Sequence, residues 1–153
     1  MKLNALYVKY GLLIATVLIT YFLIIRLIGL HDNHWLRVLN GVIVAYGIYA
    51  VIKKKKSLEG ASFEYFSGFG IGILTGVIAT LTFVGFMGVY LFHIEPAFAD
   101  ELLSHIAGSV GGPEILLLIL GIEGISSSVV LSLTFMQKFK VTRNVIDQET
   151  IVT

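Results

Sequence analysis

The sequence predicts an all-α membrane protein built as a bundle of four transmembrane helices. Of its 153 residues, 56% are hydrophobic and only 14% are charged, a composition typical of membrane proteins rather than water-soluble domains. Polar and charged segments divide the chain into four apolar runs, each long enough to cross the hydrocarbon core of a bilayer. One bundle accounts for the whole length, so we treat residues 1–153 as a single membrane domain.

The first two apolar runs, residues 6–30 and 35–52, are joined by a short polar turn and predict an antiparallel helical hairpin. The start resembles a signal peptide, but no small-x-small cleavage site follows and apolar residues continue beyond Arg26. An uncleaved first span is therefore the better interpretation. The second run is short, yet it reaches ~27 Å at the helical rise of 1.5 Å per residue. We expect the run Lys53–Lys56 to end it.

The third run, residues 63–92, is the longest, and we expect it to be the packing centre of the bundle. Small residues recur in it at every fourth position: Gly68, Gly72, Gly76 and Thr80. This spacing places them on one helical face, where a second helix can approach closely. We favour a helix of the same chain, with a second copy or a partner protein as the alternative. Gly60 is expected to break the preceding helix, and Ser62 to act as the N-cap of the third span.

Between the last two spans, residues 96–107 predict a short amphipathic helix. Pro96 fits the first helical position, and three apolar residues follow at intervals of four: Phe98, Leu102 and Ile106. Such a helix lies at the membrane surface or caps the bundle. Pro113 then starts the fourth span, residues 114–137, and residues 138–153 form a polar tail.

Basic residues set the expected orientation. Nine of the eleven Lys and Arg residues fall on one side of a four-span chain: Lys2, Lys9, Lys53, Lys54, Lys55, Lys56, Lys138, Lys140 and Arg143. The positive-inside rule places this side, with both termini, in the cytoplasm. The run Lys53–Lys56 is a stop-transfer signal, and it could also bind anionic lipid headgroups there. The net charge of +1 offers no field suited to nucleic acid.

One stretch carries a family resemblance. Ser62-Phe63 opens the third span, Gly70 follows eight residues after Ser62, and Tyr90 leads to the outer motif at 94–98, IEPAF. These features, the order of the spans and the total length resemble a family of small bacterial membrane proteins known as domain of unknown function 4199. The chain departs from that family at Glu64, where a glycine is usual, and in lacking prolines after Glu123. The resemblance implies four helices in a bacterial inner membrane and supplies no activity.

Glu123 is the most informative single residue, because it lies about nine residues into the fourth span. A carboxylate at such depth costs roughly 2.5–3.5 kcal/mol unless it is paired, protonated or beside a cavity, so it is a functional candidate. Its neighbours Ser126 and Ser127 are small and polar. Glu123 could bind a proton, or it could be a structural carboxyl that accepts hydrogen bonds across the bundle. Arg26, near the outer end of the first span, could pair with Glu123 or extend to the outer headgroups.

The four histidines all map to the outer side: His31, His34, His93 and His105. A divalent metal site needs three or four ligands that converge, and the sequence cannot show convergence across two loops. We therefore expect no metal and no other cofactor, and keep these histidines as the alternative. No His, Lys or Cys lies deep inside a span, where it could activate a serine, so no enzyme is expected.

The leading hypothesis is a non-enzymatic accessory or assembly component of an inner-membrane complex. It rests on the small-residue face, the small soluble portions and the lack of a catalytic constellation. Its expected partners are membrane lipids, with anionic headgroups on the cytoplasmic side, and a second copy or a larger complex. The alternative is a small transporter or proton-coupled permease that uses Glu123 with Arg26. A metal or lipid sensor on the outer face is a third possibility.

Overall fold

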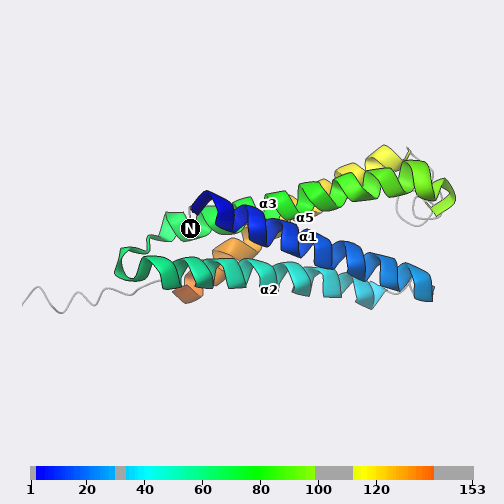
Figure 1. The fold of residues 1–153 in the computed structure, drawn as a ribbon. Helices are drawn as coiled ribbons and strands as arrows, with labels where there is room; N and C mark the ends of the chain where they lie inside the picture. The colour runs from blue at the N-terminus through cyan, green and yellow to red at the C-terminus, as the bar shows by residue number, and fades with distance from the viewer. Residues whose placement is uncertain (1–2, 30–33, 99–111, 140–153) are drawn as a thin grey trace, which may run out of the picture.

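The computed structural model describes residues 3–29, 34–98 and 112–139, which form four long helices lying side by side (Figure 1). These are α1 (Leu3–Ile28), α2 (His34–Glu59), α3 (Tyr65–Val89) and α5 (Pro113–Phe139). Successive helices run in opposite directions (Figure 1). One end of the bundle therefore carries Lys53–Lys56 and Lys138, and we call it the lysine end. The opposite end carries Arg26 and is called the arginine end.

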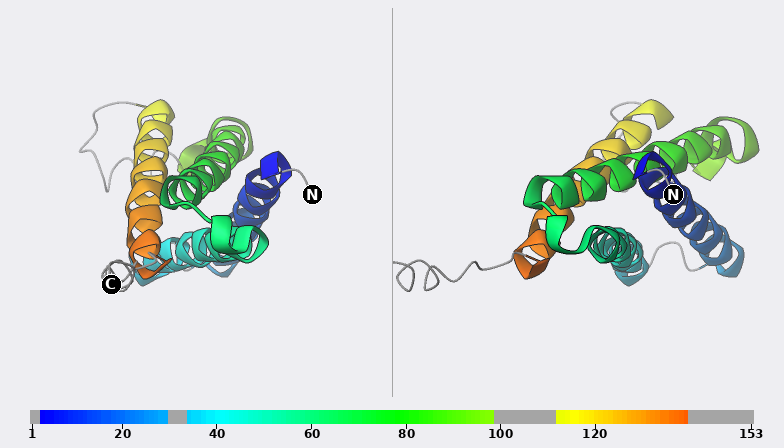
Figure 2. Two further views of the ribbon diagram at one scale, coloured as in Figure 1. Left: turned by 90° about the vertical axis from the view of Figure 1, so that its left-hand side faces the viewer. Right: turned by 60° about the vertical axis from the view of Figure 1, so that its left-hand side comes forward.

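Helix α3 is the central element of the bundle. It packs most extensively against α1 and α5 and also contacts α2, and the left-hand, end-on view of Figure 2 shows it between α1 and α5 with α2 beneath. Three buried clusters follow its length. Ile71 marks the cluster at the lysine end, Ala79 the middle one, and Met87 the cluster at the arginine end. The predicted role of the third apolar run as packing centre agrees with this arrangement.

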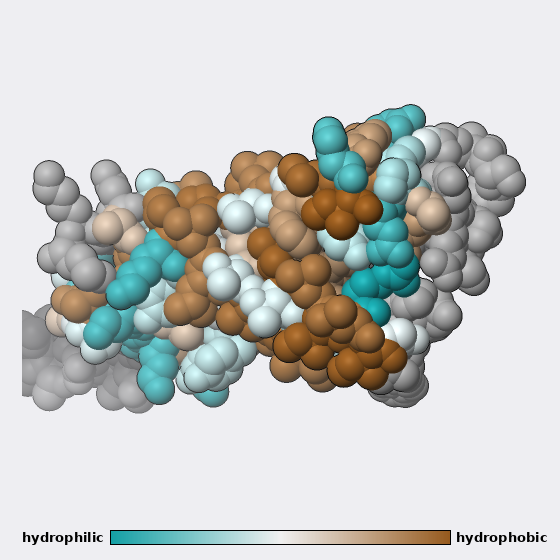
Figure 3. Space-filling view, turned by 45° about the vertical axis from the view of Figure 1, so that its right-hand side comes forward, coloured by the Kyte–Doolittle hydropathy of each residue, from teal (hydrophilic) through white to brown (hydrophobic). Residues whose placement is uncertain are grey.

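Three of the helices are long and apolar enough to cross a membrane, counted within the described residues: Ala5–Ile28, Tyr65–Ile94 and Pro113–Phe139. Large apolar side chains lie exposed along these helices, including Leu27, Leu81 and Leu118. In the space-filling view an apolar band separates polar side chains toward the two ends of the molecule (Figure 3). A water-soluble domain would bury such a surface, so the structure indicates an all-helical membrane protein.

The connection between α2 and α3 corrects two predictions. Helix α2 does not end at the lysine run but continues to Glu59, because lysine is a good helix former and ends only the apolar stretch. Gly60 then breaks the helix as predicted, with φ of +54°, and opens a 3₁₀ turn, Gly60–Ser62. Ser62 is not the N-cap: its hydroxyl donates to the carbonyl of Glu59 at 2.7 Å, and Glu64 occupies the cap position of α3.

The two helix ends near Arg26 also differ from the predicted spans. Helix α1 ends at Ile28 and is followed by Gly29, whose φ of +73° is the left-handed conformation common after helices. Helix α3 passes into a π-helical turn, η2 (Tyr90–Ile94). Residues 96–98 are helical, so Pro96 begins a helix as predicted. The remainder of the expected surface helix, to residue 107, and the tail from residue 140 lie outside the described residues.

Candidate functional site

An ion pair joins the two segments at the arginine end. Arg26 comes from the last turn of α1, and Glu95 follows the π turn η2. Arg26 Nε donates to Glu95 Oε2 at 3.1 Å, and Arg26 Nη2 donates to Glu95 Oε1. The side chains are 20% and 36% exposed, so the pair is partly buried. Two parallel charge-assisted bonds make this the stronger, geometrically specific kind of ion pair.

Aromatic side chains surround this pair. The hydroxyl of Tyr90 donates to Glu95 Oε2 at 2.7 Å. The guanidinium carbon of Arg26 lies 4.2 Å from the ring centroid of Phe98, close enough for a cation–π interaction. Phe22 packs edge-on against Tyr90, with ring centroids 5.2 Å apart. We call Arg26, Glu95, Tyr90 and Phe98 the Arg26 clamp, because together they fasten α1 to the segment after α3.

The π turn is what brings Tyr90 and Glu95 together. The backbone N–H of Glu95 donates to the carbonyl of Tyr90 at 2.9 Å, a bond that spans five residues instead of four. The two side chains at the ends of this turn therefore lie close enough to hydrogen-bond. Single π turns of this kind are frequent at functional sites.

Arg26 pairs with Glu95 in the clamp, whereas Glu123, one of its two predicted alternatives, lies at another level of the bundle. Glu123 is next to Gly124, and Gly124 packs directly on Thr80 of α3. Thr80 precedes Tyr90 by ten residues, which is about 15 Å along the helix. The structure therefore places Arg26 beside Glu95 at the end of the bundle, and Glu123 at a deeper level. This difference in depth does not favour the Arg26–Glu123 pair, which was one of two alternatives for Arg26, because two residues in the same half of a membrane can still lie at different depths.

Glu123 lies on the outer surface of α5. Its side chain is exposed, as are those of Ile122 and Ser126, whereas Ser127 is partly buried. Pro113 is ten residues before Glu123 and Phe139 is sixteen after it, or about 15 Å and 24 Å along the helix. The carboxylate thus faces outward from the bundle at mid-helix.

Small residues of α3 and α5 meet along a regular seam. The residue pairs are Gly68 with Met136, Gly72 with Ser132, Gly76 with Ser128, and Thr80 with Gly124. A Cβ atom on Gly72 or Gly76 would overlap the serine opposite. Residue numbers rise along α3 as they fall along α5, which is the register of two antiparallel helices. Sequence reasoning did not find the α5 side, although Gly124, Ser128 and Ser132 show the same four-residue spacing.

The lysine end uses two of its lysines within the bundle. Lys55 is only 5% exposed, and its Nζ donates to the carbonyl of Ser67 at 3.1 Å and lies 3.6 Å from Glu59 Oε1. Lys56 donates to the carbonyl of Phe139 at 3.4 Å, a favourable place for a cation at a helix C-terminus. Lys53 and Lys54 are exposed. Of the four lysines expected to bind headgroups, two therefore contact groups within the bundle and two are exposed at its surface.

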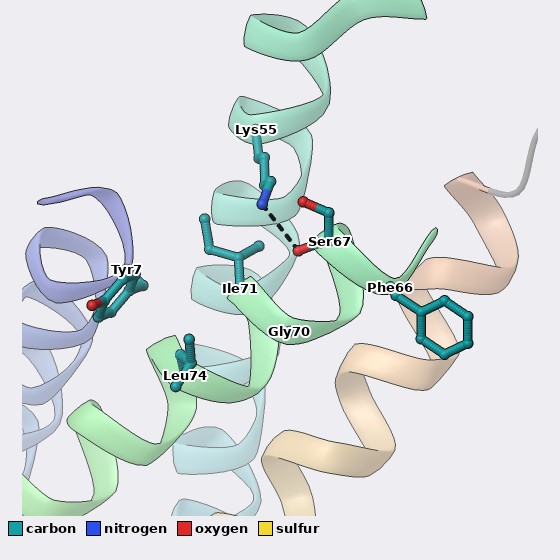
Figure 4. A pocket seen from close by; sticks show the side chains of 7 residues that line it. All are labelled: Tyr7, Lys55, Phe66, Ser67, Gly70, Ile71 and Leu74. Atoms are coloured by element: carbon teal, nitrogen blue, oxygen red, sulfur yellow. Dashed lines mark hydrogen bonds between the residues drawn. The ribbon is translucent and has the colours of Figure 1, made fainter. Parts of the chain in front are cut away.

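A hollow of about 230 Å³ next to Lys55 lies between α1, α2 and α3. Figure 4 shows Tyr7, Ile71 and Leu74 around it, with Lys55 pointing to the Ser67 carbonyl. Gly70 leaves its wall open, since a Cβ atom there would meet nothing within 4 Å. Because the Lys55 ammonium is already bonded to a carbonyl and close to a carboxylate, the hollow offers little positive charge to a ligand.

The metal hypothesis stays a prediction. His93 is exposed in η2. His31 and His105, and the side chain of His34, lie outside the described residues. Within residues 3–29, 34–98 and 112–139, no group of three or more His, Asp or Glu side chains converges in a way that could hold a metal ion.

The sequence model of one protein family, described as "Protein of unknown function (DUF4199)", matches residues 9–110. The chain belongs to this family. The DUF4199 match contains α2, α3 and all four residues of the Arg26 clamp, while α5 with Glu123 lies beyond it. Comparison with curated proteins and with solved structures gives no match. The DUF4199 assignment confirms the resemblance found in the sequence and leaves the activity to be inferred from the structure.

Proposed function

We propose that this protein is a non-enzymatic accessory or assembly component of a membrane protein complex, and that it docks through the outer face of α5. The occupant we infer is a transmembrane helix of another protein that carries a basic or hydrogen-bond-donating side chain at the depth of Glu123. In this proposal the chain resides in a bacterial inner membrane, and α2 is the fourth span.

The observation that supports the proposal is the exposed carboxylate of Glu123 in the middle of α5. A charged side chain at the centre of a span costs roughly 2.5–3.5 kcal/mol on insertion scales. The side chain of Glu123 is exposed at the bundle surface, where a helix of another protein can reach it. A partner helix that offers a cation or hydroxyl at this depth adds a stabilising polar contact to the carboxylate, and the exposed Ser126 offers a second one.

The proposed topology follows from the arrangement of α2. It is 26 residues long and lies beside three helices that can each cross a membrane. At 1.5 Å per residue it extends about 39 Å, enough to span the hydrocarbon. Lys53–Lys56 and Lys138 then lie at one membrane surface, which the positive-inside rule assigns to the cytoplasm. Both termini share this side.

Cross-linking tests the docking surface. A photoreactive residue at Ile122, which is 60% exposed, should capture a partner helix in native membranes, whereas one at the buried Leu116 should not. The captured helix should carry Lys, Arg, His, Ser or Thr within one turn of the cross-link. Glu123→Gln should reduce capture, and Glu114→Gln, the same change at an exposed residue in the first turn of α5, should not. Capture of a second copy alone, or capture unaffected by Glu123→Gln, would overturn the proposal.

A small proton-coupled permease remains the second candidate, because Glu123 lies at mid-span. Its outward position means that a path past it would have to form between two or more copies of the chain. Proton-linked flux into reconstituted vesicles tests this candidate. Flux that is abolished by Glu123→Gln would favour the permease over the accessory component, and flux that is unchanged would exclude it.

A further inference from the structure

The lysines at the lysine end differ in what they bind. Lys55 and Lys56 are occupied by the carbonyls of Ser67 and Phe139. Glu59, the acidic residue closest in sequence, lies beside Lys55 and so compensates an inward charge. Lys53 and Lys54 are exposed. Within the run Lys53–Lys56, the positive charge left available is therefore that of the two adjacent residues Lys53 and Lys54.

These two lysines border an open groove of about 270 Å³ between α1 and α2. Tyr10 of α1 forms one wall. The other wall is a single stripe of α2, whose members follow one another at helical spacing: Tyr46, Tyr49, Ala50, Lys53, Lys54 and Ser57. None of the seven described residues that line the groove is acidic. The groove thus combines an uncompensated cationic rim with hydroxyl groups.

The groove also has a second, less polar part. Tyr46 precedes Ser57 by eleven residues, so the stripe extends about 16 Å along the helix axis. Ala50 leaves room in its middle, and Tyr46 is 74% exposed beside the apolar Val42. Tyr49 is held in place by the rings of Phe135 and Phe139, at centroid distances of 5.5 Å and 5.6 Å. A soluble anion would contact only the cationic rim of the groove, whereas a lipid would contact the groove along its whole length.

We propose that this groove binds one anionic glycerophospholipid. Its phosphate contacts Lys53, Lys54 and the Ser57 hydroxyl, and one acyl chain lies along Ala50 between Tyr10 and Tyr46. The inference goes beyond the accessory role and does not depend on Glu123. It requires only that the lysine end lies at a membrane surface, where each lysine near anionic headgroups contributes a roughly fivefold gain in binding.

Lipid binding to the purified full-length chain in detergent tests the site, with phosphatidylglycerol as the probe and phosphatidylcholine as the zwitterionic reference. K53Q/K54Q should lower the preference for phosphatidylglycerol by roughly 25-fold, the product of two fivefold terms. K2Q/K9Q removes the same charge, and its Lys9 is exposed in α1 without lining the groove. This control should keep most of the preference. An equal loss in both double variants would overturn the proposal, since it would indicate diffuse charge.

A second variant tests the acyl-chain part without changing charge. Ala50→Phe should fill the groove and abolish the preference, while its elution and helical circular dichroism remain those of the wild type. If that variant fails to fold, Tyr46→Ala, at a largely exposed position, replaces it and should weaken retention of a two-chain lipid more than of a headgroup analogue. Retained preference in the folded variant, or displacement of the lipid by inorganic phosphate, would overturn the lipid assignment. Glu123→Gln should leave the preference unchanged, which separates this test from the partner proposal.

Discussion

The arginine end and the lysine end both fasten helices through a cation, but the bonds are of different kinds. Arg26 binds a side-chain carboxylate through two donors and lies over an aromatic ring. Lys55 and Lys56 each donate to a backbone carbonyl. An arginine fork needs a matching partner in a fixed orientation, whereas an ammonium is a point charge that accepts many geometries. The arginine end should therefore tolerate substitution less well than the lysine end.

The largest expected effect is at Arg26. Arg26→Ala should lower the free energy of unfolding by about 2 kcal/mol, because it leaves the partly buried Glu95 without its ion pair and removes the contact with Phe98. Arg26→Lys should restore about half of this loss, since it keeps the charge and not the fork. Denaturant unfolding in a fixed detergent, followed by circular dichroism, measures both. Equal stability of the lysine variant and the wild type would show that charge alone holds this end.

A smaller effect is expected at Tyr90. Tyr90→Phe removes only the hydroxyl that donates to Glu95 and should cost about 1.5 kcal/mol, as hydrogen bonds to charged groups do. The double variant with Arg26→Ala should lose less than the sum of the single losses, because both residues act on one carboxylate. The same unfolding assay gives the coupling, and strict additivity would contradict the clamp.

The smallest of the three effects is expected at Lys55. Lys55→Met keeps the aliphatic stem and removes the ammonium that binds the Ser67 carbonyl, at a cost of about 1 kcal/mol. Lys54→Met is the matched control one residue away on the exposed surface, and it should change stability by less than about 0.5 kcal/mol. A loss at Lys55 that exceeds the loss at Arg26 would reverse the proposed order of the two ends.

Hydropathy was sufficient to predict the helical class and the three helices that are long and apolar enough to cross a membrane, because both properties follow from the length of an apolar run. It misplaced the end of α2, since Lys53–Lys56 marks the edge of the apolar run and not of the helix. The family resemblance rested on residues around α3, and residues 9–110 do match that family. A functional role for Glu123 and the location of the chain in a bacterial inner membrane stay predictions.

The clamp could not be predicted from the sequence, because Arg26 and Glu95 are 69 positions apart and meet only through the π turn. The outward direction of the Glu123 side chain could have been predicted from the sequence. Gly124, Ser128 and Ser132 repeat the spacing of the α3 glycines, and matching the two rows would have placed Gly124 on α3. Its neighbour Glu123 is turned by about 100° from that contact, as adjacent residues of a helix are.

The π turn after Val89 also has a consequence for how length changes act on this protein. The π turn contains one residue more than an α-helical turn, so it changes the direction in which every later side chain points from the helix axis. Deleting a single residue within Tyr90–Ile94 would restore ordinary winding and rotate Glu95 by about 100° about the helix axis. The contact between α1 and the segment after α3 thus depends on the number of residues in this turn as much as on their identity, and a change of one residue is enough to break it.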